Sequence, residues 1–158
     1  MTPSKLPPSE KPKSLRTREW IFYAQQYAEA ASLLDIHTPE QWLPRVQLSG
    51  QSVECGLKAY LSAAEQKVPT SHNLLLLGKQ AEDSGCLVTD SQALAVFHLS
   101  LFFHQDIRTG TKYKARYPSS NSEARDGPIA LHDNVVELVE SLCSQAAIKA
   151  ASTAVMSP

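Results

Sequence analysis

The stretch QSVECGLKAYL (residues 51–61) decides the fold class. Its apolar residues recur three or four positions apart, which is the spacing of one buried helix face. Glu54 precedes Lys58 by four positions, the favourable order for an ion pair on a helix. We therefore expect a helix over about residues 44–67, in which Glu54 and Lys58 form a structural polar pair that fixes helix register. The expected core stripe comprises Val46, Val53, Leu57, Tyr60, Leu61 and Ala64, and the polar stripe beside it Gln47, Gln51, Glu54 and Lys58.

Four other segments show the same periodicity, and none alternates with the period of two that a strand requires. Ser71 and Asp90 are the expected N-caps of two of them, and Gly85 is the expected stop of the third helix. The pattern predicts an all-α fold, an antiparallel bundle of four long helices plus one short helix. The predicted helices cover about residues 17–34, 44–67, 71–85 and 91–108, and a last one begins near residues 126–128.

The segment from residue 93 to residue 103 is the longest dense apolar run. A membrane span needs about 20 apolar residues, and this run is too short. Its apolar residues cover nearly the whole circumference of a helix, as in a helix buried by several neighbours. We therefore expect it to be the central helix.

Length and charge predict one soluble domain. The chain has 158 residues, of which 42% are hydrophobic and 20% charged, with a net charge of −1. These values are typical of globular proteins and exclude a polycationic DNA coat. The composition of residues 1–17 predicts a flexible, basic, Pro-rich leader, or alternatively a basic arm that binds along a phosphate backbone. No apolar stretch follows this basic start, so we expect a cytoplasmic location and no membrane contact. Residues 18–148 form the expected domain, and residues 149–158 a frayed tail.

The three cysteines predict neither a metal site nor a disulfide framework. Cys55, Cys86 and Cys143 are widely separated and form no Cys-x-x-Cys pair. Zinc sites need four ligands in close pairs. Three buried thiols in a reducing compartment, with no metal and no cofactor, are the simplest interpretation.

Three motifs in order resemble the HEPN (higher eukaryotes and prokaryotes nucleotide-binding) superfamily. The first is the helix at residues 51–61, and the second is Ser71-His72-Asn73-Leu74, where we expect His72 to serve the turn. The third is a long helix ending near a basic segment that contains Arg116-Tyr117-Pro118. The resemblance covers roughly residues 18–145. It implies a small helical bundle, often a homodimer, that is in many members encoded beside a nucleotidyltransferase-like partner as a toxin–antitoxin pair.

The resemblance also implies a candidate catalytic motif. Many members are metal-independent ribonucleases with an Arg-x(4–6)-His motif, which Arg125 and His132 match here. A histidine can activate the 2′-hydroxyl as a general base, and an arginine can stabilise the negative phosphorane oxygens. However, Gly127-Pro128 places Arg125 before the helix, whereas the family's arginine usually lies on it. The alternative is that His132 is a half-buried packing residue.

A basic segment after the apolar helix is the candidate nucleotide or RNA site. Cations that alternate with aromatic residues can neutralise phosphates while the rings stack on bases. The alternative is a solvated loop. This segment contains Arg108, Lys112, Tyr113, Lys114 and Arg116.

These observations favour a HEPN-like bundle that binds nucleotide or RNA, with metal-independent endoribonuclease activity if it is catalytic. The alternative is a non-catalytic interaction or scaffold bundle that partners a nucleotidyltransferase-like protein.

Overall fold

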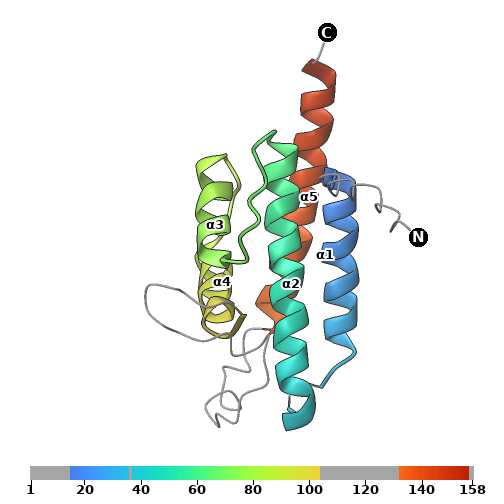
Figure 1. Cartoon of the computed structure of the whole chain (residues 1–158), viewed down its shortest axis with the longest axis vertical. Helices are drawn as coiled ribbons and strands as arrows, with labels where there is room; N and C mark the ends of the chain where they lie inside the picture. Colours follow the sequence, from blue (N-terminus) through green and yellow to red (C-terminus); the bar gives the residue numbers. More distant parts are fainter. Residues whose placement is uncertain (1–14, 36, 104–131, 157–158) are drawn as a thin grey trace, which may run out of the picture.

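The computed structural model describes residues 15–35, 37–103 and 132–156, and this part of the chain is all-α, as predicted. It contains no strand, and none of its helices has a stretch long and apolar enough to cross a bilayer. α1 and α2 run in opposite directions, and α3 and α4 lie side by side across α2 from α1 (Figure 1). The helices are α1 (Thr17–Ser32), α2 (Pro39–Ala63), α3 (Leu74–Asp83), α4 (Asp90–Phe103) and α5 (His132–Met156).

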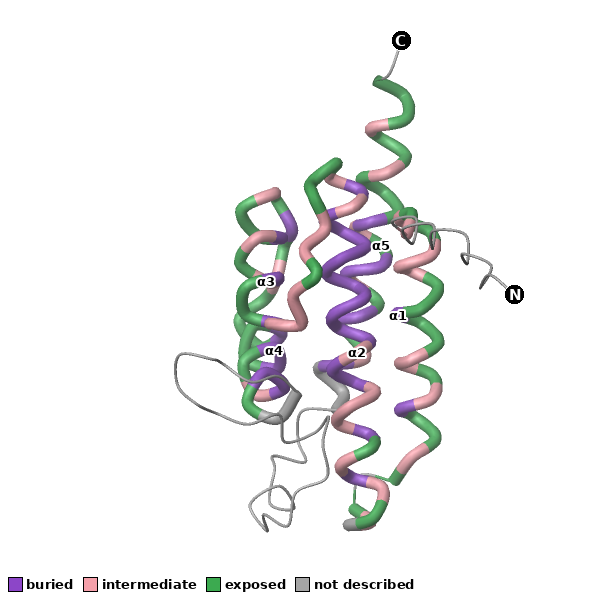
Figure 2. The backbone as a smooth tube through the Cα atoms, viewed as in Figure 1, coloured by how far each residue is buried: buried purple, intermediate pink, exposed green. Residues whose placement is uncertain are grey.

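α2 is the central helix. Every residue from 52 to 61 is buried, so the helix is covered around its whole circumference there (Figure 2). Each of the other four helices contacts it. A buried polar group of α2 finds a partner inside the protein: the Ser52 hydroxyl donates a hydrogen bond of 2.7 Å to the carbonyl of Ala24 in α1. Ala59, a small residue of α2, is fully buried.

The prediction that the apolar helix at residues 91–108 is central was wrong. The described part of that helix, α4, lies at one side of the molecule, next to α3 (Figure 1). Leu94, Phe97 and Leu101 are 51%, 45% and 42% exposed. α4 buries Ala95, Val96 and Leu99 instead. Apolarity on all sides is therefore a poor guide to position here, because α2 is buried more completely although its sequence is more polar.

Two helix caps differ from the prediction, and the stop at Gly85 is confirmed. Asn73, rather than Ser71, caps α3, since its side chain accepts a hydrogen bond of 3.0 Å from the Leu76 amide. Thr89, rather than Asp90, caps α4: its hydroxyl accepts from the Gln92 amide, and the Gln92 side chain accepts from the Thr89 amide. Such a reciprocal pair satisfies two amides that a helix start leaves free. Gly85 follows α3 with φ +97°, a conformation that favours glycine.

Two helices extend beyond their expected limits. α2 begins at Pro39 and contains Pro44, where we expected it to begin. Pro39 lies in the first turn, where a proline is tolerated because its missing amide would have no partner, whereas Pro44 lies inside the helix. α5 continues to Met156, through most of the segment in which we expected a frayed tail. Its last turns are rich in alanine, the best helix former, and the Thr153 hydroxyl lies 3.4 Å from the carbonyl of Ala63 at the end of α2.

Gly56 lies at a close contact between α2 and α5. A Cβ atom at this position would lie 3.1 Å from Cδ1 and 3.2 Å from Cβ of Leu142. Leu142 is fully buried, so it cannot swing away into solvent. The absence of a side chain at Gly56 therefore sets the distance between these two long helices.

We expect Gly56→Ala to lower the free energy of unfolding by about 1–3 kcal/mol, because overpacking forces the surroundings to shift. Gly78→Ala is the matched control, since Gly78 also lies within a helix and its Cβ would meet only Val96 Cγ1, at 3.9 Å. It should stabilise the protein by up to about 1 kcal/mol through helix propensity. Urea unfolding of both variants tests this, and equal effects would contradict the close approach.

Candidate functional site

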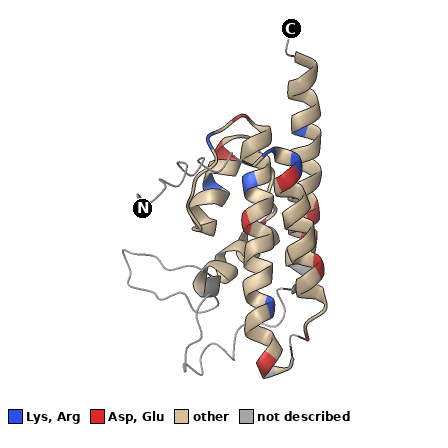
Figure 3. Cartoon of the chain, turned by 45° about the vertical axis from the view of Figure 1, so that its right-hand side comes forward, with Lys and Arg blue, Asp and Glu red and all other residues tan. Residues whose placement is uncertain are grey.

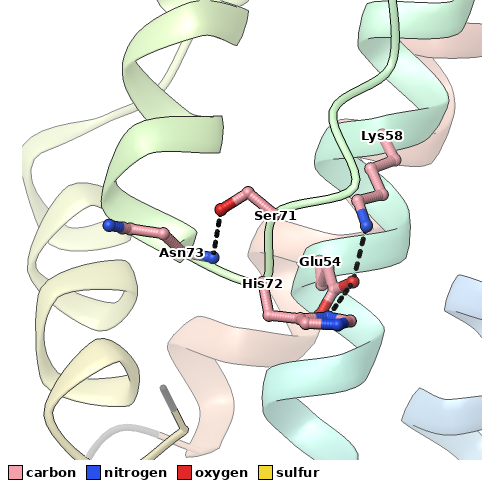
Figure 4. A network of polar contacts seen from close by, with 5 residues as sticks. All are labelled: Glu54, Lys58, Ser71, His72 and Asn73. Carbon is pink, nitrogen blue, oxygen red and sulfur yellow. Dashed lines mark hydrogen bonds and ion pairs between the residues drawn. The ribbon is translucent and has the colours of Figure 1, made fainter. Parts of the chain in front are cut away.

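A buried ion pair on α2, between Glu54 and Lys58, is joined to His72, which follows Glu54 by 18 positions. Lys58 Nζ donates to Glu54 Oε1 at 2.7 Å, and both side chains are less than a tenth exposed. His72 Nδ1 lies 2.9 Å from Glu54 Oε1 and 3.1 Å from Oε2 (Figure 4). Glu54 thus accepts hydrogen bonds from two sides, which offsets the cost of burying its charge.

The chain path after α2 brings His72 to this position. The segment between α2 and α3 runs back beside α2 (Figure 1). His72 thereby comes to lie next to Glu54 (Figure 4). Ser71 Oγ accepts from the Asn73 amide at 3.0 Å, and Asn73 then caps α3. This turn holds the backbone of His72 between two anchored residues (Figure 4).

Lys58 has an aromatic neighbour from α1. Its Nζ lies 5.3 Å from the ring centroid of Trp20, within the range of a cation–π contact. The indole Nε1 of Trp20 is buried and has no hydrogen-bond partner among the described residues. The charged pair of α2 is therefore covered by an aromatic ring from α1 and by an imidazole from the segment before α3.

A pocket of about 350 Å³ opens beside this network, between α1, α2 and His72. Trp20, Tyr23 and Tyr27 lie on one face of α1, because their spacing of three and four positions matches the helical turn. Pockets for small ligands are typically apolar and aromatic with a few polar groups at defined positions. The lining residues are Leu15, Trp20, Tyr23, Tyr27, Gln51, Glu54, Cys55 and His72.

The lining suits a flat, largely uncharged group. Aromatic faces favour stacking, and the charge of Glu54 is already balanced by Lys58 at 2.7 Å. Gln51 and His72 add polar atoms that can orient a ligand by hydrogen bonds. The pocket therefore fits an uncharged heterocyclic ring better than a charged group of a ligand.

The cysteines contribute no reactive thiolate. Burial, together with the nearby negative charge of Glu54, raises the pKa of the Cys55 thiol to about 12. Burial raises the pKa of Cys86 and Cys143 to about 11 each. A thiol is nucleophilic only as the thiolate, so these residues act as small core side chains near neutral pH. The described residues also contain no group of three or more His, Cys, Asp or Glu side chains placed to hold a metal ion.

Most of the residues singled out from the sequence lie outside the described part of the chain. Arg125 is among them, as are Arg108, Lys112, Tyr113, Lys114 and Arg116. His132 is the first described residue of α5, and nothing of its side chain is described. Glu54 and Lys58, by contrast, form the buried pair above, and Glu54 contacts His72. Two of the three motifs on which the HEPN resemblance rests thus touch each other.

Two features of the pocket differ from what the sequence pattern suggests. Trp20, Tyr23 and Tyr27 share one apolar face of the first helix, yet Tyr23 is 43% exposed. We expected His72 to serve its own turn, and it pairs with Glu54 instead. The polar stripe of α2 was the signal that could have found this contact, because a buried Glu54 and Lys58 require further polar partners. His72 is the one histidine of the segment between α2 and α3.

Charged residues are scattered over the described helices and form no broad basic surface there (Figure 3). Comparison with known proteins finds no matching family model, no matching curated protein and no matching solved structure.

We expect Glu54→Ala to cost about 3–5 kcal/mol of unfolding free energy, because it leaves the buried ammonium of Lys58 unpaired. The double variant Glu54→Ala/Lys58→Met should recover most of this loss, since it removes both charges. Asp83→Ala is the matched control: it breaks the exposed pair Lys79–Asp83, which has the same four-residue spacing, and should change stability by at most about 0.5 kcal/mol. Chemical unfolding measures all three, and a similar cost for Glu54→Ala and Asp83→Ala would contradict the burial argument.

Proposed function

We propose that this protein binds a nucleotide or single-stranded RNA and holds one base in the pocket between α1 and α2. The observation that carries the proposal is the lining, which combines Trp20, Tyr23 and Tyr27 with the polar edge of Gln51, Glu54 and His72. Base–aromatic stacking contributes about 1–3 kcal/mol per base and tolerates any base, since every base has a π-face. Hydrogen bonds from Gln51 and His72 would then select among bases.

Basic residues at the start of α1 would contact the phosphate. Leu15 lines the pocket, and Arg16 and Arg18 follow it directly at the helix N-terminus. Both arginines are exposed. The positive end of the helix dipole adds to their attraction for an anion. The base would therefore lie among the aromatic rings, and the phosphate toward Arg16 and Arg18.

The wider proposal is a HEPN-like protein, with an antiparallel bundle of four long helices and one short helix. It includes a homodimer, a nucleotidyltransferase-like partner and a toxin–antitoxin role in the cytoplasm. The contact between the Glu54 motif and the His72 motif supports it. The basic segment with Arg108, Lys112, Tyr113, Lys114 and Arg116 would bind further nucleotides of an RNA.

We expect Tyr23→Ala to weaken the binding of AMP or CMP about tenfold, because it removes a stacking surface. Phe22→Ala is the matched control. Phe22 is 55% exposed, and its ring centroid lies 5.6 Å from that of Tyr23 in an edge-on contact, but Phe22 does not line the pocket. It should leave affinity unchanged. Isothermal titration calorimetry measures both, and equal losses, or no binding to the wild type, would reject the proposed site.

Ribonuclease activity is proposed as an extension of this binding function. Arg125 and His132 would act without a metal, with His132 as general base at the 2′-hydroxyl and Arg125 on the phosphorane oxygens.

We expect the wild type to cleave single-stranded RNA in the presence of EDTA, and His132→Ala to lower the rate at least 100-fold. Tyr23→Ala serves as a comparison, because it should raise KM with a smaller effect on kcat. Gel analysis of cleavage products measures the rates. No cleavage by the wild type would leave a non-catalytic binding protein, and equal cleavage by His132→Ala would reject the role assigned to His132.

A second candidate function is protein binding, as an interaction or scaffold bundle. The observation that favours it is an apolar surface on α3 and α4 (Leu75, Leu76, Leu94, Phe97 and Leu101), each residue of which is 42–51% exposed. Apolar surfaces of this kind commonly mark protein contacts. This face is a candidate for the homodimer or partner interface.

A further inference from the structure

His72 has one ring nitrogen, Nδ1, that is hydrogen-bonded to Glu54 and a second, Nε2, that makes no hydrogen bond with the described residues. Nδ1 lies within 3.1 Å of both carboxylate oxygens of Glu54. An ionised carboxylate only accepts hydrogen bonds, so Nδ1 must be the donor. In a neutral imidazole with its proton on Nδ1, Nε2 carries a lone pair and accepts.

The surroundings of Glu54 keep its carboxylate an acceptor and therefore keep Nδ1 of His72 the donor. Lys58 also donates to Glu54 Oε1, and an ammonium group has no acceptor. The Glu54 side chain is 9% exposed, whereas the His72 side chain is 43% exposed and lines the pocket. The carboxylate is therefore the buried anchor, and the outer edge of the imidazole is accessible to a ligand.

We propose that Glu54 fixes the tautomer of His72, so that Nε2 accepts a hydrogen bond from an exocyclic amino group of the bound base. This inference rests on the proposed nucleotide binding and names the class of base. Adenine and cytosine present an amino group, whereas uracil and hypoxanthine present a carbonyl oxygen in its place. Glu54 acts here as a positioning residue that does not itself contact the ligand.

The tautomer can be measured without any ligand. In ¹⁵N-labelled wild type, with the imidazole neutral, the Nδ1 resonance of His72 should show a bonded proton and Nε2 a free lone pair. The His72→Gln variant assigns the signals by their loss. A proton found on Nε2 of the neutral wild-type ring would overturn the proposal.

Glu54→Gln should reverse the tautomer. The amide oxygen can still accept from Lys58, while the amide NH₂ donates to His72 Nδ1, and the ring proton then moves to Nε2. Nε2 becomes a donor and should favour a carbonyl oxygen on the ligand. Gln is nearly isosteric with Glu, and the wild-type measurements decide the matter even if this variant does not fold.

Nucleotides that differ at one position provide the binding test. Wild type should bind AMP about tenfold more tightly than purine riboside 5′-monophosphate, which has hydrogen in place of the amino group. It should likewise prefer CMP to UMP. Glu54→Gln should instead bind IMP more tightly than AMP. Calorimetry measures each affinity.

The outcomes separate the two proposals. Equal affinity of the wild type for AMP and purine riboside 5′-monophosphate overturns the role of Nε2 and leaves nucleotide binding intact. No binding of any of the nucleotides overturns both the proposed function and the base preference. A preference for amino bases that Glu54→Gln reverses supports both.

Discussion

The burial of a charged pair inside the central helix is the constraint on which the rest of the structure depends. Glu54 and Lys58 lie where α2 is covered on all sides, and an unpaired charge there would cost several kcal/mol. Each must therefore find partners within the protein. Lys58 has Glu54 and the ring of Trp20, and Glu54 has Lys58 and His72. These contacts join α1, α2 and the segment before α3, so the polar network also orients the elements around it.

The same constraint produces the pocket. α1 approaches α2 closely at Ser52, which donates to a backbone carbonyl of α1, but the bulky aromatic residues of α1 face the polar stripe of α2. A space of about 350 Å³ remains beside Glu54, between these rings and the polar stripe. A structural ion pair and a binding surface can thus share the same residues. This explains how a chain with few charged residues in its core can still present an oriented histidine.

The comparison of α2 with α4 shows how far helix position follows from sequence. α4 is apolar on every side, yet Leu94, Phe97 and Leu101 are about half exposed. α2 carries a polar stripe, yet it lies at the centre. Hydropathy measures the cost of leaving a side chain in water, and it does not register whether a polar group has a partner inside the protein. Gly56 adds a second reason why the position of α2 does not follow from its hydropathy. Its missing side chain leaves room for Leu142 of α5, and the sequence of α2 alone does not reveal this contact.

The sequence by itself determined the number of helices in the described part, their approximate limits and the four-residue spacing that pairs Glu54 with Lys58. These features depend on residues within one or two turns of each other, and the helical period makes such neighbours predictable. Only the tertiary structure decided which helix is central, that His72 meets Glu54 across 18 positions, and that Trp20, Tyr23 and Tyr27 line a pocket rather than a closed core. Those contacts depend on how whole helices pack, and the path of the segment between α2 and α3 is not encoded in any local period.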